Sequence, residues 1–418
     1  IKGDFQIPNL DDLDRAFIDE EIEIVRTSVS DIEKLNLMPF LDGKKYLDIP
    51  SNIDPANVIT LKNGRFSGLL NDFEVFGSIT TGLGNVYVEN GLKFTKNELD
   101  GLYYYHGIID NGTTKDIAVE NLNLGAITSN SMLGKTSGHL KIKKGSKGFE
   151  PKDMDLKFMG NFTSTSINGY NYQSINIKEG QFGNDRFKGI IDIIDDNLDL
   201  NYDGYVDFKN ELIFNFDITV GDSFLAKLKL LEGDLATNLK TKMNVNIIGT
   251  SLDKVSGNLI VESFEYFDGV KAYKLDESLT LDIIRTDTLN SIALKSSIVD
   301  LDFHGDFNLN HIVPVFKNQI GLLLSNYIVQ EVIPDHVDQS FDLNIELKNI
   351  NPLLAFFEME MYLQPNSSMW ASYSLDERKL DVNFKSDSIA YMDKSFTGIS
   401  LSNNLISFSS SKFRYLAM

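Results

Sequence analysis

The sequence predicts a mainly β protein, built as one elongated, curled antiparallel sheet that forms a repeating β-groove, or β-taco. Apolar and polar residues alternate over long stretches, and from 198 to 220 ten of the twelve even-numbered positions are apolar. Strand-like segments follow one another in series and are separated by short polar turns. The chain contains 28 Phe and 16 Tyr but only nine Pro, a composition that favours strands.

Composition excludes several function classes. The chain has 418 residues and a formal charge of −21, which argues against a nucleic-acid partner because few cations are available to neutralise phosphates. It has no cysteine, so disulfides and thiol catalysis are excluded. No run of about 18 apolar residues is present, so no membrane-spanning helix is expected. The chain begins at Ile1, and we expect a targeting segment and a membrane anchor to lie outside it.

Residues 1–311 are predicted to form the groove segment. A short helix is expected near 31–37, where Ser30 and Glu33 have the spacing of a capping box. The pairs Asn63-Gly64 and Asn90-Gly91 are typical of hairpin turns between strands. Residues 126–150 are rich in Ser, Gly and Lys and are interpreted as a loose hairpin or loop.

Residues 312–333 are predicted to form one amphipathic helix. Pro314 suits its first turn and Pro334 ends it. Its apolar stripe is interpreted first as ordinary core packing, which in this fold would also close part of the groove. The residues of this possible groove-closing stripe are Phe316, Ile320, Leu323, Leu324 and Tyr327. Strands resume over 334–418 and are expected to continue the groove.

The apolar side of the alternating strands is the candidate functional surface. An apolar strand face must be buried against something, and a long series of such strands favours an open, curled sheet over a compact sandwich. The natural contents of an open hydrophobic channel are acyl chains. The residues expected to line it are Leu198, Leu200, Tyr202, Val206, Phe208, Leu212, Phe214, Phe216, Ile218, Val220, Met243, Val245, Ile247, Leu279, Leu281 and Ile283.

Catalytic and metal-binding motifs are not found in the sequence. The five histidines have no metal-ligand spacing, and no nucleophile or nucleotide-binding motif occurs. We therefore expect no enzyme activity, no cofactor and no metal site. Asp199 to Asp207 matches the first nine positions of a calcium-binding loop, but Asn210 stands where a bidentate Glu is needed. The favoured interpretation is the polar face of a strand, with calcium binding as the alternative.

Several segments resemble the TamB and AsmA-like proteins of diderm bacteria, which are large bridge-like proteins of the translocation and assembly module. The segments are Gly64-Arg65-Phe66-Ser67-Gly68, Asn71-Asp72-Phe73, 77–88, 180–208, 249–269 and 298–309 with the helix that follows. The resemblance implies a groove that conducts phospholipid and a periplasmic location. It also implies association with the inner and outer membranes, through an anchor outside this chain and an outer-membrane β-barrel assembly partner. It supplies no catalytic residues.

Two other interpretations remain open at this point. Alternating strands of about ten residues are also the signature of a transmembrane outer-membrane β-barrel. Against this are the single Trp, the lack of aromatic girdles and the helix at 312–333. A structural β-solenoid or adhesin without lipid would show the same strand rhythm.

Overall fold

The computed structural model is mainly β, with an antiparallel sheet, as the alternation predicts. It describes residues 2–6, 16–31, 53–69, 72–99, 102–108, 115–146, 155–250, 254–286, 290–308, 312, 314, 340–351, 354, 359–374, 379–391, 394–402 and 405–407. The chain divides into two compact units. The first comprises Ile1–Lys209 and Leu225–Glu232, and the second comprises Asn210–Phe224 and Gly233–Met418.

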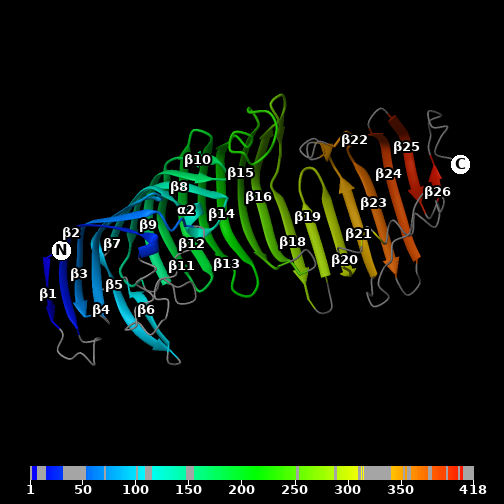
Figure 1. Cartoon of the computed structure of the whole chain (residues 1–418). Helices are drawn as coiled ribbons and strands as arrows, with labels where there is room; N and C mark the ends of the chain where they lie inside the picture. The colour runs from blue at the N-terminus through cyan, green and yellow to red at the C-terminus, as the bar shows by residue number, and fades with distance from the viewer. Residues whose placement is uncertain are drawn as a thin grey trace. The chain divides into compact units, whose positions relative to one another are not determined.

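The first unit is a series of antiparallel strands with one short helix (Figure 1). Each strand pairs with a neighbour next to it in sequence or one strand further on, because short turns favour local antiparallel pairing. Its elements are β1 (Lys2–Gln6), β2 (Phe17–Ser28), β3 (Val58–Leu69), β4 (Asp72–Thr81), β5 (Gly84–Leu99), β6 (Leu102–Ile108), β7 (Lys115–Asn123), α2 (Leu124–Thr128), β8 (Leu133–Ile142), β9 (Asp155–Ile167), β10 (Tyr170–Tyr172), β11 (Ile175–Gly183), β12 (Arg186–Asp195) and β13 (Leu198–Asp207).

The second unit repeats the same topology. Its strands are again antiparallel and again pair with sequence neighbours. Its elements are β14 (Ile213–Ser223), β15 (Asn238–Ile248), β16 (Ser256–Phe267), β17 (Ala272–Lys274), β18 (Leu279–Arg285), β19 (Asn290–Lys295), β20 (Asp300–Asp306), β21 (Ser340–Leu347), β22 (Met361–Leu363), β23 (Ser367–Ser374), β24 (Lys379–Tyr391), β25 (Lys394–Ser402) and β26 (Leu405–Ser407).

The segment 225–232 belongs to the first unit although it lies between β14 and β15 in sequence. Leu228 is fully buried, and the Nζ of Lys229 donates to the backbone oxygen of Gly169 at 2.7 Å. The Nδ2 of Asn168 donates in return to the backbone oxygen of Lys229 at 3.3 Å. These contacts fasten the segment to the turn between β9 and β10.

The helices differ in part from the sequence prediction. Residues 29–31 are helical, and the helix starts before the expected position because the Oγ of Ser28, not that of Ser30, accepts the Asp31 backbone N–H at 3.1 Å. The remainder of the range 31–37 lies outside the described residues. In the range 312–333, Ile312 and Pro314 are helical, and the remainder also lies outside the described residues. Among the described residues, no helix is long and apolar enough to cross a membrane.

The prediction of a loose hairpin over 126–150 is wrong for most of that range. The helix α2 occupies its start, capped by the Asn123 side chain, which accepts the Ala126 N–H. The regular strand β8 follows and pairs on both sides, with β7 and with β9. Ser and Gly content alone suggested a loop, but Leu140 and Ile142 supply the apolar alternation that holds β8 in the sheet.

Candidate functional site: two apolar sheet faces

The first unit presents one apolar face, which we call the first apolar face. In β12 and β13, Ile191 lies directly opposite Tyr202, and Ile193 lies opposite Leu200. Residues directly opposite each other in an antiparallel pair point to the same side of the sheet. The same side continues into β11 and β9, β8 and β7, through Ile175, Ile177, Phe182, Leu156, Phe158, Phe162, Leu140, Ile142, Ile117 and Val119.

The other side of the same strands is polar. Asp192 lies opposite Asn201, whose Nδ2 donates to the Oδ1 of Asp192 at 2.6 Å. Arg186 lies opposite Asp207, and its Nη2 is 2.7 Å from the Oδ2 of that carboxylate. The Lys178 ammonium holds the pKa of Asp192 below its usual range, and the Asn201 amide adds a smaller effect in the same direction. Ion pairs and amides therefore keep this side hydrated.

The second unit presents a second apolar face, and the strand register places the predicted side chains of this unit on it. Phe214, Phe216 and Ile218 of β14 lie opposite Ile247, Val245 and Met243 of β15. The same row continues through Leu259 and Val261 of β16. It then reaches β18, where Leu279 and Leu281 lie opposite Val261 and Leu259, and Ile283 lies opposite Gly257. Three strands, β14, β15 and β18, thus bring ten predicted lining residues, Val220 among them, to one side, and β16 adds Leu259 and Val261.

Of the predicted residues of the first unit, Leu198, Leu200, Tyr202 and Val206 lie on the first apolar face. Burial raises the pKa of the Tyr202 phenol, with a smaller contribution from Asp203. Phe208 was predicted to line the same face. This residue lies beyond the end of β13 and is 53% exposed. The reason is that the Asp207 carboxylate accepts the Lys209 N–H at 2.9 Å and starts the turn one residue earlier than expected. Leu212 lies just before β14.

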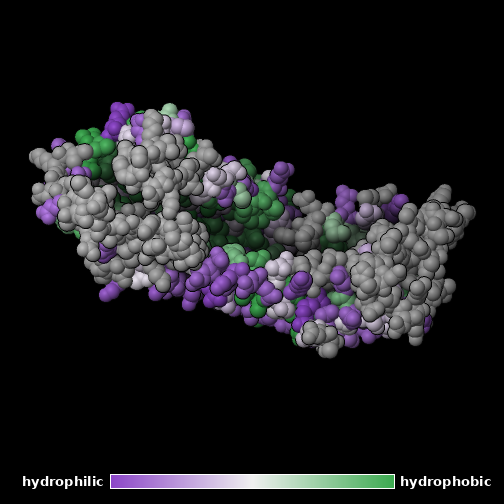
Figure 2. Space-filling view, turned by 60° about the horizontal axis from the view of Figure 1, so that its bottom comes forward, coloured by the Kyte–Doolittle hydropathy of each residue, from purple (hydrophilic) through white to green (hydrophobic). Residues whose placement is uncertain are grey.

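Hydrophobic side chains gather in a hollow of the molecular surface, and hydrophilic side chains lie along part of its rim (Figure 2). Most of the predicted lining residues are half-buried, so they are neither packed in a closed core nor fully exposed to water. A half-buried apolar row of this extent is larger than the scattered apolar residues of an ordinary protein surface.

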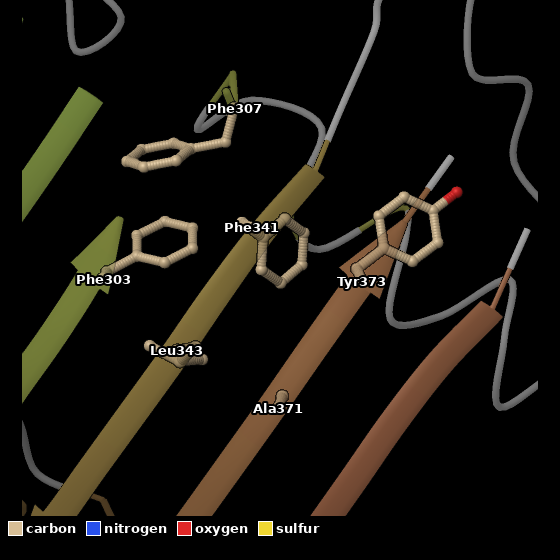
Figure 3. Close-up of a cluster of buried hydrophobic side chains, with 6 residues drawn as sticks. All are labelled: Phe303, Phe307, Phe341, Leu343, Ala371 and Tyr373. Carbon is tan, nitrogen blue, oxygen red and sulfur yellow. The ribbon is translucent and has the colours of Figure 1, made fainter. Parts of the chain in front are cut away.

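One part of the second apolar face is covered by the protein itself. Phe303, Phe307, Phe341, Leu343, Ala371 and Tyr373 form a buried group that we call the aromatic cluster (Figure 3). Phe307 comes from the chain after β20 and stacks on Phe303 with 3.8 Å between ring centroids. Phe341 meets Phe303 edge-on at 5.2 Å, and Tyr373 lies beside Phe341 at 5.5 Å.

Ile312 also packs against the aromatic cluster, so the start of the predicted groove-closing helix reaches the apolar face. Its predicted contact residues, Phe316, Ile320, Leu323, Leu324 and Tyr327, lie outside the described residues.

Two charged residues on the apolar faces were missed by the sequence interpretation. Lys115 is fully buried and lies opposite Ile142 on the first apolar face. Arg285 lies opposite Asn290 on the second, and its guanidinium carbon is 4.7 Å from the centre of the Phe307 ring. The alternation along the strand could have predicted this, because Arg285 follows Leu279, Leu281 and Ile283 at the next odd-numbered position and so points to the same side. Lys115 does the same ahead of Ile117 and Val119.

A shallow pocket of about 260 Å³ lies near the polar side of β9, β11, β12 and β13. Lys143, Lys157 and Lys188 line it together with Glu179 and Asp203. The Nζ of Lys143 lies 3.9 Å from the Glu179 carboxylate, so part of its positive charge is already neutralised. No group of three or more His, Asp or Glu side chains among the described residues is arranged to hold a metal ion.

Comparison with known proteins identifies no relative: no family model, no curated protein and no solved structure matches the chain. The resemblance to TamB and AsmA-like proteins therefore stays a prediction based on the sequence segments quoted above.

Proposed function

We propose that the apolar faces bind the acyl chains of phospholipids and that the protein is a periplasmic, bridge-like carrier between the inner and outer membranes. Its role would be phospholipid transport, support of outer-membrane protein assembly, or both. It would act with an inner-membrane anchor outside this chain and an outer-membrane β-barrel partner. Such a role is binding and conduction, and it requires no catalytic group.

The observation that carries the proposal is the direct register of apolar residues across β14, β15, β16 and β18. A row that crosses many strands on one side, with ions and amides on the other, offers a continuous path to an acyl chain. Each methylene moved from water to such a surface gains about 0.8 kcal/mol. The family resemblance and the absence of an enzyme motif support the same function.

A photoreactive amino acid at Phe214 tests the proposal, with Asn215 as the matched control. The two positions are adjacent in β14 but point to opposite sides of the sheet. We expect crosslinks to lipid from position 214 and few from position 215, measured by mass spectrometry of protein expressed with its natural anchor. Crosslinks only to protein side chains at both positions would contradict the proposal.

Phe216→Asp provides a functional test. A carboxylate on the apolar face must lose its hydration when an acyl chain covers it, so bound lipid is expected to fall strongly. Asp217→Asn changes the opposite side of the same strand and is expected to leave lipid content unchanged. A native mass spectrum of the wild-type chain without any lipid would instead favour the structural or adhesive role.

A further inference from the structure

The turn between β16 and β17 displays an apolar residue in an unusual place. Val270 is 90% exposed, the highest exposure among the large hydrophobic residues of the described part of the chain. Exposed turns are dominated by Gly, Asn, Asp, Pro and Ser, and the backbone conformation of a turn gives no preference for a β-branched aliphatic residue. Turn formation therefore does not account for Val270.

The turn holds Val270 in a fixed position. The Asp268 carboxylate accepts the backbone N–H groups of Val270 at 2.8 Å and Lys271 at 2.7 Å. The backbone N–H of Asp268 donates to the Lys271 oxygen at 3.1 Å, which closes the turn. The side chain of Val270 is therefore displayed by an ordered turn.

A second exposed aliphatic residue lies at the same end of the sheet. Asn238, the first residue of β15, is directly opposite Phe267, the last residue of β16. Leu235 is three residues before Asn238 and Val270 is three residues after Phe267, and Leu235 is 62% exposed. In Figure 1 this end of β15 and β16 is the upper one.

The two turns are in contact. The Asp234 side chain lies so close to Gly269 that a Cβ atom there would be 2.9 Å from the Asp234 Cγ. The Asp234 carboxylate also accepts the Ala236 N–H at 2.8 Å, which orders the residues around Leu235. We call Leu235 and Val270 the apolar tip.

The apolar tip lies at the end of β15 and β16 from which the second apolar face starts. Tyr266, close to the tip in β16, lies opposite Leu239, and the next pairs on the same side are Thr241 with Phe264 and Met243 with Val261. Tyr266 is buried, so this end of the face is already shielded from water. An acyl chain that leaves a bilayer beside the tip would meet an apolar surface within a few residues.

We propose that the apolar tip inserts into the interfacial layer of a lipid bilayer and places the second apolar face next to its acyl chains. Aliphatic side chains on projecting turns fit a deformable lipid surface, whereas protein interfaces are centred on aromatic residues and Arg. The adjacent charges are mixed: Asp234 and Asp268 beside Lys271. The attraction therefore does not depend on anionic headgroups. Membrane contact is independent of the proposed function, but the transfer of lipid from tip to face rests on it.

Flotation of the full chain with vesicles of phosphatidylcholine and phosphatidylethanolamine tests membrane contact. We expect the wild-type chain to float and the double variant Leu235→Asp, Val270→Asp to bind about tenfold more weakly or worse, because two apolar insertions are lost. Ile194→Asp is the matched control, since Ile194 is 70% exposed on the polar side of β12 and is expected to leave binding unchanged. Wild-type chain that does not float, or equal flotation of wild type and double variant, would overturn the proposal.

A fluorescence measurement gives an independent reading of insertion. The chain has one Trp, so Val270→Trp in a Trp370→Phe background reports from the tip alone. We expect a blue shift of its emission on addition of the same vesicles, and an unchanged spectrum would contradict insertion. Failure of the two proposals is distinguishable: a chain that floats but never carries lipid retains the tip and loses the carrier function. A chain that carries lipid but does not float retains the carrier function, and its apolar tip does not insert into the bilayer.

Discussion

Two regions arise from the same alternating pattern but differ in how their apolar side chains pack. They are the first apolar face around β9, β11 and β12 and the aromatic cluster around β20, β21 and β23. In the first region, Phe158 lies opposite Gly180, and its ring covers that glycine. A Cβ atom added to Gly180 would be 2.6 Å from the Cε2 of Phe158. The ring of Phe187 covers Gly189 in the same way, at 2.8 Å.

In the second region, large residues face one another. Phe303 lies opposite Leu343, and Phe341 lies opposite Tyr373. Phe307 and Ile312 then add a further layer from outside the sheet. The comparison shows that alternation specifies the apolar side, whereas the layer that covers it in the second region comes from residues after β20, Phe307 and Ile312.

Phe341→Ala is expected to have the largest effect, because it removes a ring that is 1% exposed from the centre of the aromatic cluster. Deletion of a fully buried aromatic ring lowers the free energy of unfolding by about 3–5 kcal/mol. The single Trp370 lies on β23, so its fluorescence during urea denaturation reports on the second unit. Met369→Ala, at a partly buried residue beside the cluster, serves as a control with a smaller expected loss. Equal losses would show that the cluster is no better packed than the rest of the face.

Gly257→Ala is expected to rank second. Gly257 has a φ of +131°, and a Cβ would lie 2.0 Å from the Asn246 carbonyl oxygen, so the backbone itself must move. Backbone strain of this kind costs about 1–3 kcal/mol. The loss should appear in the same Trp370 denaturation curve, and unchanged stability would mean that β15 and β16 separate at little cost.

Gly180→Ala tests the open region and is expected to cost about 1 kcal/mol. The three atoms nearest to the new methyl group all belong to the Phe158 ring, which can rotate away from the sheet. The displaced ring would then occupy part of the first apolar face, so bound lipid should decrease more than stability does. Native mass spectrometry together with hydrogen exchange in β11 separates the two quantities. Lower stability with unchanged lipid content would contradict the assignment of this face as open.

The smallest effect is expected from the polar side of the open region. The Lys209 backbone N–H and the Arg186 guanidinium hold the pKa of Asp207 below its usual range. A carboxylate whose pKa is lowered by folding stabilises the fold above its unfolded pKa of about 3.9 and loses this contribution as the pH falls through its folded pKa.

Asp207→Asn should therefore make the thermal midpoint of the first unit less sensitive to pH between about 5 and 3. Circular dichroism at several pH values measures the midpoint, and Asp199→Asn on the same polar side is the control. A slope unchanged by Asp207→Asn would show that this ion pair does not contribute to acid stability.

Much of the face assignment followed from the sequence, because side-chain direction in a strand has a period of two except where a bulge shifts the register, as after Ile177 in β11. On this basis alone, Phe214, Phe216 and Ile218 were placed on the same side of the sheet as the apolar residues of β15 and β18. The end of β13 before Phe208 did not follow from periodicity, since it is set by a hydrogen bond from the Lys209 backbone to Asp207. Turn chemistry of this kind overrides periodicity over one or two residues.

Other features depend on contacts distant in sequence and could not be predicted from local pattern. The edge-on contact of Phe341 with Phe303 and the return of Lys229 to Gly169 are examples. Arg285 and Lys115 could have been found by extending the numbering of each strand by one more alternate position.

The strand order has a consequence for how the chain acquires its structure. Each strand pairs with a sequence neighbour or with the next strand but one. Each hairpin of this chain can therefore form once its second strand has been synthesised, without waiting for the rest of the sheet. The latest strand then always exposes an unpaired edge, on which the next strand is added. Strands would therefore be added to the sheet one after another, starting from the N-terminus. A sheet of this type can also lengthen by inserted hairpins without a change in the rest of its contacts.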